Sequence, residues 1–181
     1  MIIIHGLNKA FGEKIIFSNF NLEIPDGSFV VISGDSGSGK STLLNMIGGI
    51  EKPDSGSIII EGLNITRLKN KNSFFADTVG FLFQNFALLE NKTVKENLSL
   101  IKKSKPKLKY HLKKLLIVWG YQRKLTKKVY QLSGGEQQRV ALARLMMKKC
   151  SVVLADEPTG SLDKKNRDIV MRLLHELNER R

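Results

Sequence analysis

Apolar residues occur along the chain in short runs separated by turn-forming residues, and several of these runs fit β-strands. In the first half of the chain the runs cover residues 2–4, 20–24, 29–32, 57–60 and 79–83. Residues 20–24 alternate between apolar and polar with a period of two, as in a strand with one buried face. Residues 29–32 are all apolar and follow a Pro-Asp-Gly turn, so we predict a buried strand there.

Other segments show the three-to-four-residue spacing of helices. Residues 41–46 are predicted to form a helix that ends at the Gly48-Gly49 pair. Thr93 and Glu96 match a capping box, which predicts the start of a second helix, and a helical pattern continues to residue 119.

A third predicted helix follows the Ser-Gly-Gly sequence at 133–135 and runs toward Met147, and a short apolar strand follows at 152–155. In the last segment Ile169, Leu173 and Leu177 repeat every four positions, which predicts an amphipathic helix. Because strands and helices alternate in this way, we predict an α/β fold with a largely parallel sheet.

The predicted strand at 29–32 leads into Gly-Asp-Ser-Gly-Ser-Gly-Lys-Ser at 34–41, which fits the pattern G-x-x-x-x-G-K-[ST] without a mismatch. Glycines let the backbone curl so that consecutive N–H groups point at phosphate oxygens, and the helix that follows adds the positive end of its dipole. Lys40 would place a charge on the β- and γ-phosphates, and the Ser41 hydroxyl could bind Mg²⁺. The motif predicts nucleotide binding.

Asp156 and Glu157 follow the apolar run at 152–155, where a strand is predicted to end. A phosphate-loop enzyme needs a carboxylate for Mg²⁺ and a group that orients the attacking water. We therefore predict that Asp156 holds the magnesium shell and that Glu157 is the base that deprotonates the water.

Basic residues are concentrated in one part of the chain. Lys and Arg number 30 against 17 Asp and Glu, a net charge of +13. Between Asn97 and Gly135 there is no acidic residue, and the segment holds eleven of the basic ones, Lys102, Lys103, Lys105, Lys107, Lys109, Lys113, Lys114, Arg123, Lys124, Lys127 and Lys128. Such an excess is typical of a surface that meets nucleic acid or anionic lipid headgroups, and equally of a solvated face.

Composition excludes other classes of protein. One cysteine cannot form an internal disulfide, and with three scattered histidines it does not predict a zinc site built by the protein. No apolar run reaches the roughly 18–20 residues of a membrane helix, so we do not expect this chain to span a bilayer.

These motifs resemble the nucleotide-binding domain of ATP-binding cassette (ABC) transporters over essentially the whole chain. The most specific element is Leu-Ser-Gly-Gly-Glu-Gln-Gln-Arg at 132–139, which is similar to the signature of that family. The resemblance implies a P-loop NTPase core with a mainly parallel sheet, N-terminal antiparallel strands and a helical subdomain. It also implies a single domain over 1–181, with 1–84 and 132–181 as the core and 85–131 as the basic helical subdomain.

The resemblance implies a set of binding residues for ATP and Mg²⁺. Gln84 would contact the metal and the water, beside Ser41 and Asp156 as metal ligands, and Phe11 would stack on adenine. The signature residues would close over the γ-phosphate held by a partner subunit, which implies a head-to-tail homodimer, and residues 161–163 are similar to the D-loop. The implied cofactor-binding residues are Phe11, Gly34, Ser36, Gly37, Ser38, Gly39, Lys40, Ser41, Thr42, Ser133, Gly134 and Gly135.

Two features depart from the family pattern. Family members follow the last helix with a strand and a switch histidine, whereas this sequence stops at Arg181 and its His175 lies within the helix. We therefore expect a C-terminally truncated domain that hydrolyses ATP poorly on its own. The second departure is the Leu-Met-Met after Arg144, where the family has a small residue, and we expect only local repacking there.

The function implied is that of an ATPase subunit that drives a separate membrane permease from the cytoplasmic face of the membrane. Residues 155–163, Ala-Asp-Glu-Pro-Thr-Gly-Ser-Leu-Asp, are similar to exporters of lipoproteins, macrolides, and bacteriocins or antimicrobial peptides. Two alternatives are an ABC-type ATPase associated with nucleic acid and a non-catalytic ATP-binding regulator. The 85–131 insertion is too short for the coiled coils of the first, so we expect no nucleic-acid partner, and Glu157 argues against the second.

Overall fold

The computed structural model describes residues 1–101, 124–160 and 162–179. The chain divides into two compact units, Met1–Phe75 with Asn178–Arg181, and Ala76–Leu177. Each unit has its own sheet. The segment 102–123, which holds most of the predicted basic surface and the predicted helix up to 119, lies outside the described residues.

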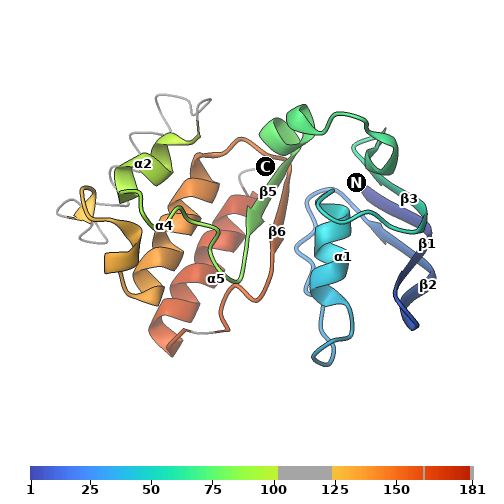
Figure 1. Cartoon of the computed structure of the whole chain (residues 1–181), viewed down its shortest axis with the longest axis horizontal. Coiled ribbons are helices and arrows are strands. Elements are labelled where there is room, and N and C mark those ends of the chain that lie inside the picture. The colour runs from blue at the N-terminus through green and yellow to red at the C-terminus, as the bar shows by residue number, and fades with distance from the viewer. Residues whose placement is uncertain (102–123, 161, 180–181) are drawn as a thin grey trace. The chain divides into compact units, whose positions relative to one another are not determined.

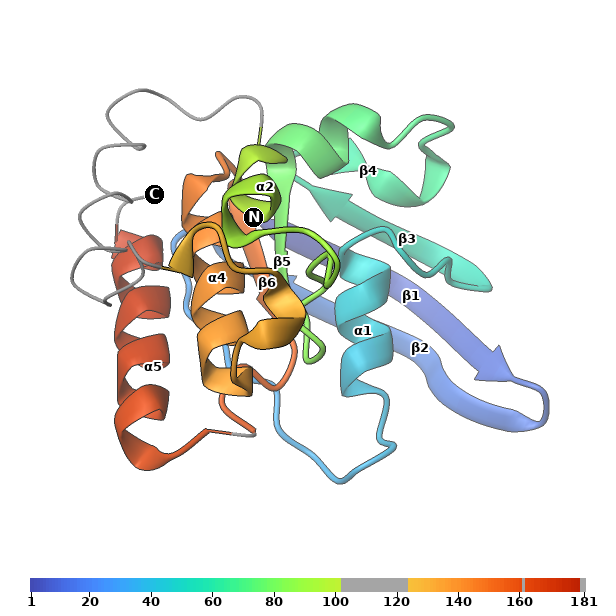
Figure 2. The same cartoon turned by 60° about the vertical axis from the view of Figure 1, so that its left-hand side comes forward.

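The first unit is built on an antiparallel sheet in the order β2-β1-β3-β4 (Figure 2). Its strands are β1 (Ile2–Phe11), β2 (Lys14–Ile24), β3 (Ser55–Ile60) and the two-residue β4 (Leu63–Asn64). The predicted runs at 2–4, 20–24 and 57–60 all lie in these strands, so those predictions are confirmed. β1 and β2 extend well beyond the predicted runs, because their pairing continues through polar positions as far as Phe11 opposite Lys14.

A bulge in β1 changes which residues face the core. Ile2 and Ile4 are buried in the first half of the strand, whereas Leu7 and Lys9 are buried in the second half. The pairing of β1 with β2 shifts between Ile4 and Leu7, and Gly6 at this point has a φ of +55°. One extra residue therefore moves the buried set from even to odd positions.

Helix α1 (Lys40–Ile47) lies against the sheet of this unit (Figures 1 and 2). Leu43, Met46 and Ile47 are its buried residues, and the helix is capped at Gly48 as predicted. A 3₁₀ turn, η1 (Ile65–Arg67), follows β4, and one π-helical turn, η2 (Phe74–Thr78), spans the division between the units.

The predicted buried strand at 29–32 is wrong. These residues belong to neither sheet, and Val30 and Val31 are 49% and 75% exposed. An apolar run becomes a strand only where a neighbouring strand supplies ladder hydrogen bonds, and the described sheet of this unit ends at β2 and β4. Apolar character alone therefore did not determine the structure of this segment.

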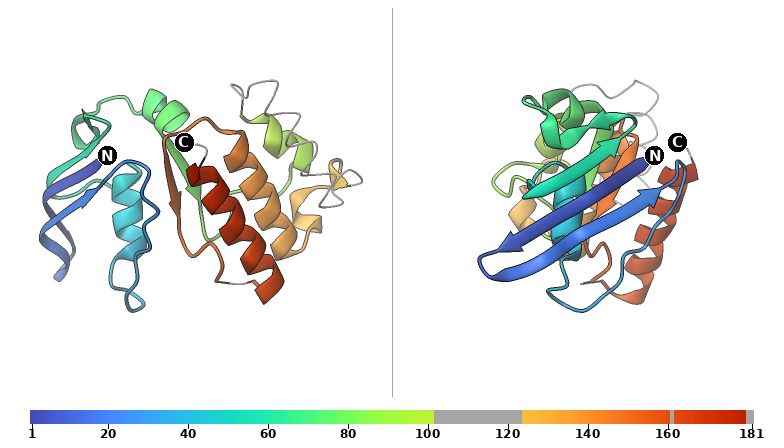
Figure 3. Two further views of the ribbon diagram at one scale, coloured as in Figure 1. Left: turned by 180° about the vertical axis from the view of Figure 1, so that it is seen from behind. Right: turned by 90° about the vertical axis from the view of Figure 1, so that its right-hand side faces the viewer.

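The second unit contains a parallel pair of strands covered by two long helices. β5 (Val79–Leu82) pairs in parallel with β6 (Val152–Ala155), with Leu82 opposite Ala155. Helices α4 (Gly134–Met147) and α5 (Lys164–Glu179) run side by side (Figure 3). Their buried residues form one core with Leu82 and Cys150. The predicted parallel pairing and both predicted helices are confirmed, although the antiparallel sheet holds more of the described strands.

A smaller core lies beneath α2 (Val94–Ser99) and the 3₁₀ turn η4 (Val129–Gln131). Val94 and Leu98 of α2 pack there with Val140 and Met147 of α4. The predicted capping box is confirmed: the Thr93 hydroxyl accepts from the Glu96 backbone N–H, and the Thr93 N–H donates to the Glu96 carboxylate.

Within the described ranges, no helix is long and apolar enough to cross a membrane. The same residues contain no group of three or more His, Cys, Asp or Glu side chains placed to hold a metal ion.

Candidate functional site

The phosphate-loop sequence at 34–41 forms an exposed loop that ends in the first turn of α1. Gly39 is the residue before the helix and has a φ of +98°. A Cβ at this position would lie 2.4 Å from Cγ2 of Ile16 and 3.1 Å from Cζ of Phe17. Glycine is therefore required at position 39 both by the backbone conformation and by the packing against β2.

The Lys40 side chain turns back across this loop. Its Nζ donates to the carbonyl oxygens of Gly34 at 2.8 Å and Asp35 at 2.7 Å. The ammonium group therefore lies over the loop, next to the N-terminus of α1, where both the helix dipole and the lysine favour an anion. Ser36, Gly37 and Ser38 are exposed in the same loop, and Ser41 and Thr42 belong to the first turn of the helix.

Phe11, the candidate adenine-stacking residue, is the last residue of β1 and is 51% exposed. The Lys9 ammonium lies 4.8 Å from the centroid of its ring. In this structure the ring thus has a cation on one side and half of its side-chain surface open to solvent.

The second unit carries the candidate acidic residues at the end of the parallel strands. Asp156 extends the pairing, because its N–H donates to the Leu82 carbonyl at 3.0 Å. Glu157 follows with a φ of +45°, and its Oε2 accepts a hydrogen bond from Nε2 of Gln84 at 3.0 Å. The structure therefore brings together Gln84 and Glu157, both of which were singled out from the sequence.

Gln84 and Glu157 line a pocket of about 170 Å³ within this unit. Phe83 and Phe86 supply apolar walls, and Gln138, Pro158 and Gly160 complete the lining. A small polar pocket with an exposed carboxylate can hold a water molecule against Glu157, which is the placement that a general base requires.

The signature residues Ser133, Gly134 and Gly135 lie at the start of α4, and the first two are exposed. Glu136 turns back to accept from the Ser133 N–H at 2.8 Å and also pairs with Lys124. The Lys124 hydrogen bond, with the Ser133 contact adding to it, lowers the pKa of the Glu136 carboxyl. The carboxylate thus keeps in place the turn that contains the exposed residues Ser133 and Gly134.

Sequence reasoning did not single out Gln138 as a site residue. It is 3% exposed, its side-chain amide donates to the Pro158 carbonyl, and its Oε1 has no hydrogen-bond partner among the described residues. The signal was its helical spacing: it shares a stripe with the buried Ala141, Leu142 and Leu145, where a polar residue is unusual. Through Gln138, α4 contacts the turn that follows Glu157.

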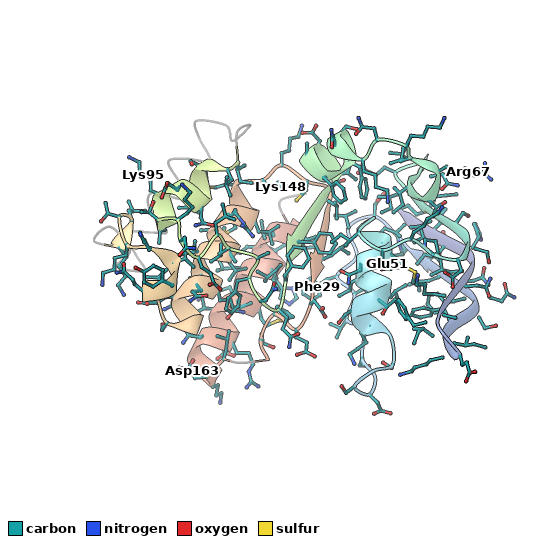
Figure 4. All side chains as sticks on the ribbon, in the orientation of Figure 1. Phe29, Glu51, Arg67, Lys95, Lys148 and Asp163 are labelled. Carbon is teal, nitrogen blue, oxygen red and sulfur yellow. The ribbon has the colours of Figure 1, made fainter. Side chains whose placement is uncertain are left out.

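Arg139 adds a second connection from α4. Its Nη1 donates to Oδ1 of Asn166 at 2.6 Å, and the Asn166 N–H donates to Oδ1 of Asp163 at 2.8 Å. Asp163, labelled in Figure 4, precedes the first turn of α5. The start of the signature helix and the end of the candidate D-loop are therefore joined by one chain of hydrogen bonds.

Arg144 holds the segment after Gln84. Its guanidinium donates to the carbonyl oxygens of Ala87 at 2.7 Å and Phe86 at 3.0 Å. Both of those residues have positive φ, +44° and +62°, a conformation that non-glycine residues seldom adopt. Burial lowers the pKa of Arg144, and the two carbonyls accept hydrogen bonds from both terminal nitrogens of its guanidinium.

Comparison with known proteins identifies the family. A family profile described as ABC transporter matches residues 17–160. The chain belongs to this family. It is 40% identical to the macrolide export ATP-binding/permease protein MacB of Campylobacter jejuni, over 99% of this chain and 29% of that protein. It is 38% identical to the lipoprotein-releasing system ATP-binding protein LolD of Bacteroides fragilis, over 99% of this chain and 86% of that protein.

Solved structures agree with this assignment. The dimeric structure of MJ0796, described as a bacterial ABC transporter cassette, matches with a TM-score of 0.86 at 36% identity, over 99% of this chain and 84% of that one. A dimer of MJ0796 bound to ADP and Pi matches with a TM-score of 0.84. The fold is therefore that of an ABC ATPase cassette. The chain spans less than a third of MacB but more than four fifths of LolD.

Proposed function

We propose that this chain is the ATP-binding and ATP-hydrolysing subunit of an ABC transporter. The observation that carries the proposal is the placement of Lys40 over a glycine-dependent loop, hydrogen bonded to the Gly34 and Asp35 carbonyls at the start of α1. Bound phosphates would accept from Lys40 and from the loop N–H groups of 36–42, and Phe11 would stack on the adenine ring.

The hydrolytic residues that we propose are Glu157 and Gln84. Glu157 would orient the attacking water and take its proton, while the Gln84 amide, 3.0 Å away, holds the carboxylate in place and can turn to the water. Mg²⁺, when bound, would neutralise developing charge on the phosphates. Its proposed ligands Ser41, Gln84 and Asp156 offer the oxygen atoms that this cation prefers.

The partners that we propose are a second copy of the chain and a membrane permease. The exposed Ser133 and Gly134 at the start of α4 support a role as an anion site for the nucleotide of the partner copy, in a head-to-tail dimer. The similarity to MacB and LolD supports docking on a permease at the inner face of the membrane, with export of a lipoprotein, peptide or antimicrobial compound. Within this proposal, 1–84 and 132–181 form the ATPase core and 85–131 the helical subdomain.

Binding and hydrolysis by the Lys40→Ala variant test the proposal. We expect ATP affinity to fall at least about tenfold and hydrolysis to be lost, because the loop then lacks its point charge. Lys69→Ala is the matched control, since Lys69 is exposed in the same unit and outside the loop. Unchanged ATP affinity in Lys40→Ala would overturn the proposed function.

A further inference from the structure

Lys9 is a charged residue on an otherwise apolar strand face. It is 8% exposed and follows Ile2, Ile4 and Leu7 in the buried set of β1. The bulge at Gly6 places positions 9 and 11 on this face. The ammonium group of Lys9 is therefore buried as a result of a local irregularity in the strand, although burial of a charge is unfavourable. Such a residue calls for an explanation beyond packing.

The turn that follows α1 provides the counter-charges. The Lys9 Nζ lies 2.6 Å from Oε1 of Glu51, which is labelled in Figure 4, and 3.5 Å from Oδ1 of Asp54, and it donates to the Lys52 carbonyl at 3.0 Å. The Glu51 hydrogen bond is the main cause that raises the pKa of Lys9, so the side chain stays charged. The Lys9 side chain is buried, whereas the side chains of Glu51 and Asp54 are 36% and 53% exposed. Partly solvated ion pairs of this kind add little net stability, which points to a role in positioning.

The same turn also fixes the backbone that leads to Phe11. Oδ2 of Asp54 accepts from the Ala10 N–H at 2.7 Å, and the Asp54 N–H donates to the Asn8 carbonyl at 2.9 Å. Residues 8–10 are thereby tied to the turn at the end of α1. The other end of this eight-residue helix begins with Lys40 of the phosphate loop.

Phe11 is the residue on which this arrangement acts. The Lys9 ammonium lies 4.8 Å from the ring centroid, within the range of a cation–π interaction, and about half of the Phe11 side chain remains open. A cation on one side fixes the ring orientation and draws electron density toward itself, which favours stacking of an electron-rich purine on the ring. The tie to α1 sets the distance between this ring and the phosphate loop.

We propose that Lys9 positions Phe11 for stacking against the base of the bound nucleotide, so that it determines affinity for the base and not for the phosphates. This rests on the proposed function, in which Phe11 stacks on adenine. Lys9 is a positioning residue that acts through Phe11 and touches no reacting group.

The test compares two ligands, so that binding of the base is distinguished from binding of the phosphates. Binding of Mg·ATP and of Mg·tripolyphosphate, which has no base, is measured by calorimetry for the full chain and for Lys9→Met, Lys9→Arg and Phe11→Ala, with a thermal midpoint for each. We expect Lys9→Met to weaken ATP binding about fivefold and to leave tripolyphosphate binding unchanged. Lys9→Arg should restore ATP affinity, because a guanidinium also pairs with carboxylates and lies over aromatic rings.

The outcomes distinguish the inference from the proposed function. If Phe11→Ala leaves ATP affinity unchanged, the stacking role within the proposed function fails. If Phe11→Ala weakens ATP binding but Lys9→Met does not, only the role of Lys9 fails. Equal weakening of both ligands in Lys9→Met would mean a general structural role and would also overturn the inference. Lys9→Gln, which is uncharged but still donates a hydrogen bond, gives the same comparison if Lys9→Met does not fold.

Discussion

The side-chain amide of Gln84 donates to the carboxylate of Glu157, with Nε2 and Oε2 3.0 Å apart, across 73 positions of sequence. The two residues follow the carboxyl ends of β5 and β6, which pair in parallel, and such strand ends meet at one edge of a sheet. The amide holds the carboxylate in place beside the pocket, which is the orientation that the proposed role of Glu157 requires.

Glu157→Gln is expected to separate binding from hydrolysis. A glutamine keeps the shape but cannot take a proton, so turnover should fall by at least about 100-fold while ATP affinity stays nearly the same. Steady-state ATPase assays and ATP titration measure the two quantities, and gel filtration with ATP should detect a stable dimer. Glu90→Gln, an exposed change in the same unit, is the control. Wild-type turnover in Glu157→Gln would contradict the assignment.

Arg144→Met is expected to reduce turnover several-fold with little effect on ATP affinity. Without the guanidinium, the carbonyls of Phe86 and Ala87 lose their donors and the segment after Gln84 can leave its positive-φ conformation. Arg144→Lys should recover only part of the loss, since an ammonium lacks the fork that reaches both oxygens. Arg167→Met, exposed on α5, controls for loss of an arginine. Equal turnover in Arg144→Met and wild type would show that Arg144 does not position Gln84.

Asn97→Ala is expected to destabilise the second unit by about 2 kcal/mol, because the part-buried N–H of Leu89 loses its acceptor, while the carbonyls of Leu89 and Thr93 keep their backbone donors. Asn97 is fully buried; its Oδ1 accepts from the Leu89 N–H at 2.8 Å, and its Nδ2 donates to the carbonyls of Leu89 at 3.0 Å and Thr93 at 3.1 Å. Urea denaturation measures the change, with exposed Asn85→Ala as the control. Similar unfolding midpoints for the two variants would contradict this role.

The capping box of α2 should make stability depend on pH in the acid range. Hydrogen bonds from the Thr93 N–H and hydroxyl, with Lys92 adding to them, lower the pKa of Glu96 from 4.5 to about 2. A carboxyl with a lowered pKa in the folded state stabilises the fold fully above its unfolded value, and this contribution is lost as pH falls from 4.5 toward 2.

Thermal midpoints of the wild type and Glu96→Gln across that pH interval check the effect. The difference between the two proteins should shrink as the solution becomes more acidic. A difference that stays constant with pH would mean that Glu96 does not titrate as a cap. Glu90→Gln again serves as the exposed control.

Features that depend on local sequence could be predicted, and those that depend on distant backbone could not. The Thr93–Glu96 capping box and the end of α1 at Gly48 follow from neighbouring residues and were confirmed. The juxtaposition of Gln84 with Glu157 follows from the geometry of parallel strands. Arg144 gave no such signal, because its acceptors are main-chain oxygens up to 58 positions away, which every residue type provides.

The strand face of β1 shows the same limit. A strict period of two starting from Ile2 and Ile4 would point Lys9 and Phe11 away from the core, and only the bulge at Gly6 reverses this. A glycine in a strand is compatible both with a bulge and with regular pairing. The sequence therefore did not predict the ion pairs of Lys9, which depend on the register of β1 in the structure. Residues 29–32 did not form the predicted strand for a related reason, since their apolar character specifies no pairing partner.

The position of Cys150 makes this chain suitable for site-specific labelling. It is the one cysteine of the sequence and is 6% exposed, in the core formed by α4, α5 and Leu82. A maleimide dye would therefore react with a thiol introduced on the surface long before it reached the native one. A fluorophore could be attached through Gln131→Cys, two residues before Ser133, with no other substitution in the chain. Its fluorescence would change when a second molecule covers the start of α4.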